Sequence, residues 1–160
     1  MTYQIADEPF PPTRLADLAV RPGAPLLASM ICGHWLSWPW FAINAYAVGS
    51  PTRRRELAWC IAGFAGSALL GVLVFALIRW NVIESRVSLE VALLGVSTWK
   101  LAASYRVATL QERSFNASAQ AGRGTRNPRA VLAVGFLVRA TIYHLVDHPL
   151  WPIIIMGGAL

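Results

Sequence analysis

Ionisable residues inside the apolar segments are the positions of this sequence best able to do chemistry, because a charge near the middle of a bilayer costs several kcal/mol. Arg139 lies ten residues after Arg129, roughly 15 Å into an apolar segment. Lys100 lies six residues before Arg106, roughly 9 Å into another. With Asn44 at a similar depth, these positions predict an intramembrane polar and cationic layer of Asn44, Lys100 and Arg139.

Two interpretations of this layer stay open. It could attract an anion, or form a salt bridge with an acidic residue of another subunit. Alternatively, Lys100 extends to the membrane surface and Arg139 bonds to main-chain carbonyls and to Asn44. Arg139 is the stronger candidate for a functional role, because its guanidinium would lie farther from the membrane surface than the ammonium of Lys100.

A second polar group is expected near the opposite membrane face. It consists of His34, Glu90, His144, Asp147 and His148. Histidines four residues apart share a helical face and could chelate a metal, relay protons, or ligate a haem between two helices. We favour the simpler interpretation, in which these residues bond to water and headgroups, and predict no cofactor.

Catalytic motifs are missing from the sequence. It contains no Gly-x-Ser-x-Gly, no His-Glu-x-x-His and no phosphate-binding glycine loop. Cys32 and Cys60 both lie in apolar stretches and form no Cys-x-x-Cys pair, which argues against thiol redox chemistry. We therefore predict that the chain is not an enzyme.

The elements that would hold these residues are predicted from composition. The chain is 56% hydrophobic and 14% charged, against roughly 45–50% and about 25% in soluble domains. We predict an all-α, polytopic transmembrane bundle in which a single domain, 25–160, follows a polar N-terminal arm, 1–24. Four helices are expected, at about 25–48, 56–79, 87–110 and 129–147, followed by a short apolar C-terminal tail.

Small residues recur every four positions in the second predicted helix, at Gly63, Ser67 and Gly71. Such a face is typical of membrane helices that pack closely against a neighbour. We expect this face to contact another helix tightly.

Basic residues predict the orientation. Loops 49–56 and 111–128 lie on the side with more arginine and should be cytoplasmic, with both termini outside. The net charge of +6 then suits contact with anionic headgroups, and we expect no nucleic-acid partner. The alanine, arginine and leucine content is typical of a GC-rich bacterium, which predicts the bacterial inner membrane.

Four helices with short loops resemble the layout of small bacterial immunity proteins against pore-forming toxins, and equally that of accessory subunits of respiratory or photosynthetic complexes. The resemblance covers architecture alone and implies no site residues. We expect a non-enzymatic protein that associates laterally with other membrane subunits or with itself. The alternatives are an oligomeric channel or transporter that uses Lys100 and Arg139, a toxin-immunity protein, and a metal or haem protein.

Overall fold

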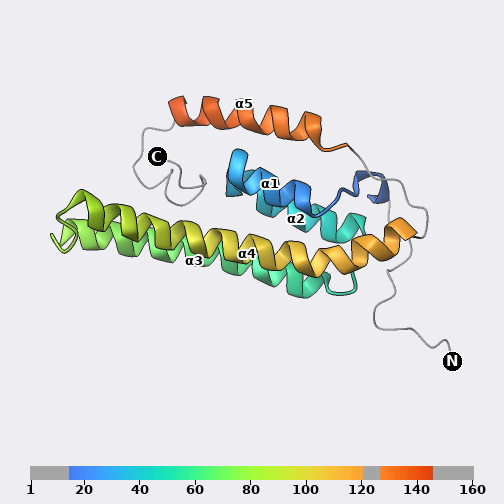
Figure 1. Cartoon of the computed structure of the whole chain (residues 1–160), viewed down its shortest axis with the longest axis horizontal. Coiled ribbons are helices and arrows are strands. Elements are labelled where there is room, and N and C mark those ends of the chain that lie inside the picture. Colours follow the sequence, from blue (N-terminus) through green and yellow to red (C-terminus); the bar gives the residue numbers. More distant parts are fainter. Residues whose placement is uncertain (1–14, 121–126, 146–160) are drawn as a thin grey trace.

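The computed structural model describes residues 15–120 and 127–145, and within them the chain is all-α, as predicted (Figure 1). No strand occurs in these residues. A short 3-10 helix, η1, precedes five α-helices. Their bounds are η1 Ala16–Leu18, α1 Gly23–Ile31, α2 His34–Ala47, α3 Arg53–Arg79, α4 Arg86–Gln120 and α5 Arg129–Leu145.

The two longest described helices, α3 and α4, pack against each other as an antiparallel hairpin (Figure 1). Their turn includes Asn81, which has a positive φ of 56°. Small residues let the two helices approach closely. A Cβ added to Gly63 would lie 3.1 Å from the Cβ of Ala103, so a larger side chain at this position would push the helices apart.

The first predicted helix, 25–48, is not continuous, and this prediction was wrong. The chain forms α1, turns at Cys32 and Gly33, and returns as α2 beside it. Gly33 has a φ of 97°, a conformation that residues with a Cβ rarely adopt. Across this helical hairpin the Ser37 hydroxyl donates a 2.8 Å hydrogen bond to the Pro25 carbonyl.

The α1–α2 hairpin lies along only one half of the α3–α4 hairpin (Figure 1). It begins and ends beside the start of α3 and the end of α4, and its tip reaches about the middle of the long helices. Trp38 and Phe41 of α2 pack there with Cys60 of α3 and Val107 of α4. This core fixes how deep the tip lies against the long hairpin.

Helices α3 and α4 also depart from the predicted bounds, whereas α5 begins at Arg129 as predicted. The loop expected at 111–128 is helical up to Gln120, because α4 continues about 10 residues beyond the predicted end at 110. At the other loop, α3 begins at Arg53, inside the expected 49–56. The last helix, α5, packs on the tip of the α1–α2 hairpin, where Gly135 lies against Leu36 and Cys32.

Among the described helices, only α3 is both long and apolar enough to cross a membrane. At nine and 14 residues, α1 and α2 are roughly 14 and 21 Å long, short of a hydrocarbon core of about 30 Å. Charged residues interrupt the apolar part of α4. The structure therefore does not confirm a bundle of four spans.

Candidate functional site

The predicted layer of Asn44, Lys100 and Arg139 is divided among three places. Asn44 is fully buried in α2, where it accepts a 2.9 Å hydrogen bond from the main-chain N–H of Val20. Its amide donates another, of 2.9 Å, to Gln111 Oε1 of α4. Gln111 in turn donates to the Phe41 carbonyl at 2.7 Å. Asn44 therefore belongs to a structural network that joins three segments.

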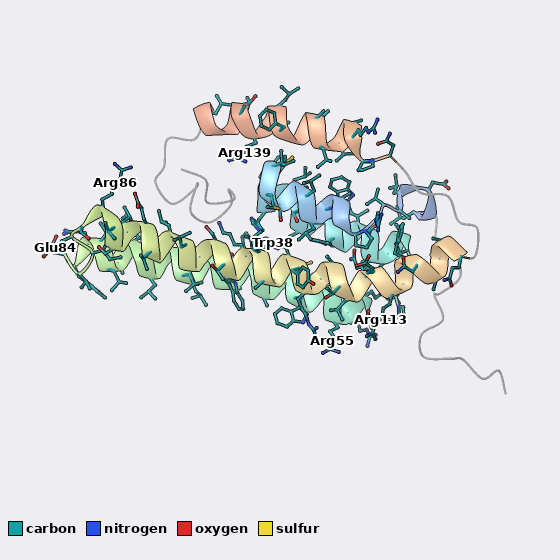
Figure 2. All side chains as sticks on the ribbon, in the orientation of Figure 1. Trp38, Arg55, Glu84, Arg86, Arg113 and Arg139 are labelled. Carbon is teal, nitrogen blue, oxygen red and sulfur yellow. The ribbon has the colours of Figure 1, made fainter. Side chains whose placement is uncertain are left out.

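Arg139 lies on α5 and points toward the end of α1 (Figure 2). Its Nη1 donates a hydrogen bond to the carbonyl oxygen of Ile31, the last residue of α1. The last carbonyls of a helix have no partner within that helix, and a cation there also interacts favourably with the helix dipole. Arg139 thus caps α1.

Lys100 of α4 lies at the tip of the α1–α2 hairpin, beside His34 at the start of α2. Lys100 is 0% exposed and His34 is 1% exposed, and the His34 ring lies near both the main chain and the ammonium group of Lys100. The ring of Trp38 lies 5.0 Å from that of His34. We define these three residues, together with Ser104 one turn after Lys100, as the tip cluster.

Several polar atoms of the tip cluster have no partner of normal hydrogen-bond geometry in the structure, although His34 lies against the main chain of Lys100. These atoms are both ring nitrogens of His34, Nε1 of Trp38 and Oγ of Ser104. Leaving a buried donor or acceptor unpaired costs about 1–3 kcal/mol. The tip cluster therefore holds four of the six buried side-chain polar atoms that lack such a partner among the described residues.

An apolar groove of about 460 Å³ runs beside the tip cluster, between α2 and α3. Aromatic and aliphatic side chains make up most of its walls. They come from His34, Trp35, Trp38, Pro39, Ala42, Leu57, Cys60, Ile61 and Phe64. A lining of this kind suits a hydrocarbon chain better than a polar ligand.

The predicted outer cluster is not assembled in the described residues. Glu90 forms an exposed 2.9 Å salt bridge with Arg86 at the start of α4, whereas His34 is buried beside Lys100, ten residues further along that helix. His144 belongs to α5, and Asp147 and His148 lie outside the described residues. No group of three metal-ligating side chains occurs in the described part of the chain.

The small-residue face of α3 is buried inside the molecule. Gly63, Ser67 and Gly71 are all buried, and Gly63 contacts both Ala103 of α4 and Trp38 of α2. The close neighbour of this face is therefore α4 of the same chain. A second chain cannot use it without separating these helices.

A different glycine faces outward. Gly95 of α4 is exposed, and a Cβ placed on it would meet no described atom within 4 Å. Thr98 and Ala102 are also exposed, three and seven residues further along, so the three residues share one side of the helix. We call Gly95, Thr98 and Ala102 the outer small face of α4.

A buried carboxylate at the start of α3 was missed from the sequence. Glu56 is 1% exposed and its Oε1 accepts hydrogen bonds from the hydroxyls of Ser50 and Thr52. Ser50 also lies 3.2 Å from the Ser114 hydroxyl of α4. The available signal was the hydroxyl-rich turn that precedes the first acidic residue of a helix.

Comparisons with known proteins give no assignment: no protein-family model, no curated protein and no solved structure matches this chain.

Proposed function

We propose that this chain is a non-enzymatic, multi-pass protein of the bacterial inner membrane that acts through lateral helix association. It would serve as an accessory or regulatory subunit, or form a homo-oligomer. The observation that carries this proposal is the outer small face of α4. Gly95 costs the helix about 1 kcal/mol relative to alanine, and no contact within the described chain offsets that cost. A helix of another subunit that packs closely on Gly95 would account for a glycine at this exposed position.

Membrane location is supported by the outer surface of the α3–α4 hairpin. Large apolar side chains remain exposed along the part that α1, α2 and α5 leave uncovered. They include Leu69 at 72% exposure, Val91 at 63% and Leu94 at 65%. Such a surface is stable in lipid and unfavourable in water. Because α4 packs along α3, it would cross the same bilayer in the opposite direction.

The helical hairpin changes the proposed topology. Since α1 begins and α2 ends beside the start of α3, the pair would enter the bilayer and return to the same side. Residues 15–20 would then face the cytoplasm together with Arg53, Arg54 and Arg55. This replaces the sequence-based expectation of an external N-terminus. In the same arrangement α5 runs from that side toward the opposite one.

The association proposal is tested by adding bulk to the outer small face. Gly95→Leu should weaken association at least tenfold, equivalent to about 1.4 kcal/mol, because the partner helix can no longer approach closely. Ala65→Leu is the matched control, since Ala65 is an exposed small residue of α3. The measurement is the size of the complex purified from native membranes, by light scattering and native electrophoresis. A complex of unchanged size in Gly95→Leu would contradict the proposal of lateral association.

An oligomeric channel or transporter is the second candidate, and the tip cluster is what favours it. Main chain that departs from helical geometry at mid-membrane depth occurs where it is buried in protein or lines a cavity. Here the non-helical turn at Cys32 and Gly33 lies beside buried Lys100. Anion flux into reconstituted vesicles that falls in Lys100→Met would support it, and flux that survives would count against it. The metal, haem and toxin-immunity alternatives gain no support from any grouping of described residues.

A further inference from the structure

A basic hollow of about 400 Å³ lies where α3 begins and α4 nears its end. Arg55 contributes from the first turn of α3. Arg106 and Arg113 contribute from α4, and seven residues, or about two turns, separate them, so they share one side of the helix. Figure 2 shows Arg55 and Arg113 projecting on the same side of the long hairpin.

Nothing acidic balances this charge within the hollow. Its lining includes no aspartate or glutamate. Glu56, the neighbour of Arg55, is buried and bonded to Ser50 and Thr52. In the described part of the chain, the guanidinium groups of Arg55, Arg106 and Arg113 make no ion pair or hydrogen bond with a protein partner. Three unbalanced cations around one hollow favour an anion with several acceptor oxygens.

The rest of the lining is divided between hydroxyls and aliphatic groups. Thr52, Thr109 and Ser114 contribute hydroxyls. Thr52 already donates to Glu56 and Thr109 to the Arg106 carbonyl, so the donors for an anion come from the arginines. Pro51 and Leu110 contribute apolar surface. A simple inorganic anion would leave that apolar surface without a partner. A ligand with a phosphate joined to a hydrocarbon portion would match both parts of the lining.

Aromatic residues place the hollow at headgroup depth. Trp59 lies one turn after Arg55, and Tyr105, which is 63% exposed, is next to Arg106. Trp and Tyr concentrate where the hydrocarbon core meets the headgroups. The apolar surface of α3 begins beyond this level and continues to the other end of the hairpin.

From these observations we propose that the hollow binds one anionic phospholipid. Its phosphate would lie among Arg55, Arg106 and Arg113, and its glycerol and upper acyl carbons would lie against Pro51 and Leu110. Basic pockets between membrane helices are suited to such headgroups. The proposal rests on the membrane location proposed above, but not on lateral association. Lipid binding that persists in Gly95→Leu would show that the lipid site does not depend on lateral association.

The test is a binding titration of the purified full chain, stripped of lipid in detergent. Short-chain phosphatidylglycerol, phosphatidylcholine and inorganic phosphate are compared by native mass spectrometry. Phosphatidylglycerol should bind at least tenfold more tightly than phosphatidylcholine. Arg113→Gln should abolish that preference, and Arg113→Lys should keep part of it, because a lysine preserves the charge but not the two-pronged contact.

Arg79→Gln, at the other end of α3, is the matched control and should leave the preference intact. Arg55→Gln provides a second, independent variant from the other helix, and circular dichroism verifies that each variant is folded. Equal binding of the two lipids overturns the proposal, as does an unchanged preference in both arginine variants. Inorganic phosphate that binds as tightly as phosphatidylglycerol also overturns it, by identifying a soluble anion as the ligand.

Discussion

Arg139 and Ile31, 108 residues apart in the sequence, are joined by a hydrogen bond from the guanidinium to the carbonyl that ends α1. The contact fastens α5 to the tip of the α1–α2 hairpin. It also explains how an arginine in an apolar helix is accommodated, because its charge meets the negative end of a helix dipole. The tip otherwise offers α5 mainly apolar contacts, such as that of Gly135 with Leu36.

Loss of this cap should destabilise the protein. Arg139→Leu leaves the Ile31 carbonyl without a partner, and we expect a loss of about 1–3 kcal/mol in the free energy of unfolding. The measurement is chemical or thermal unfolding in detergent, followed by tryptophan fluorescence. Arg129→Leu, at the exposed first residue of α5, is the control. Equal stability of the two variants would show that the Arg139 contact contributes nothing.

The buried Asn44–Gln111 pair gives a prediction about coupling. Asn44→Leu leaves Gln111 Oε1 and the Val20 N–H without their partner. Gln111→Leu leaves Asn44 Nδ2 without its acceptor and removes the side-chain donor to the Phe41 carbonyl. Each single substitution should cost about 1–3 kcal/mol. The double variant should cost less than the sum, because some of the same hydrogen bonds are lost only once. Strict additivity in the same unfolding assay would contradict the shared network.

Gly63 and Gly95 should respond differently to the same substitution. Gly63→Leu forces new atoms against Ala103 and Trp38, where a Cβ alone would already lie 3.1 Å away, so we expect a loss of at least 1–3 kcal/mol in stability. Gly95→Leu should stabilise the single chain by up to about 1 kcal/mol, since its side chain would meet open space and leucine favours helix more than glycine does. Unfolding in detergent at a concentration that favours single chains distinguishes them. A Gly95→Leu variant as unstable as Gly63→Leu would contradict the exposed position.

Topology is predicted at three exposed positions. Leu18→Cys and Arg54→Cys should be labelled by a membrane-impermeant thiol reagent from the same side, and Glu84→Cys, in the turn between α3 and α4, from the opposite side. Cys32 and Cys60 are buried and are replaced by alanine throughout. Labelling is compared between intact cells and inverted vesicles. Leu18→Cys and Arg54→Cys labelled from opposite sides would mean that 25–48 crosses the bilayer.

Composition and local sequence determined the helical class and much of two helices. The structure has α3 ending at Arg79, as predicted, and α4 beginning within one residue of the predicted start. These ends were readable because charged and turn-forming residues mark them. The continuation of α4 to Gln120 was missed, because polarity favoured a loop where packing against residues near Val48 and Ser50 stabilises helix.

What the sequence could not determine is which apolar segments cross and which turn back. An uncharged apolar segment has the same hydrophobicity whether it folds as one long helix or as two half-length helices. The sequence therefore predicted a single membrane-spanning helix at 25–48. Only tertiary packing decided otherwise: Gly33 permits the turn, Ser37 bonds across it, and Arg139 caps it from α5. The same turn moved His34 beside Lys100 and away from Glu90. Partners so distant in sequence leave no local pattern, because their contacts exist only after the chain has folded.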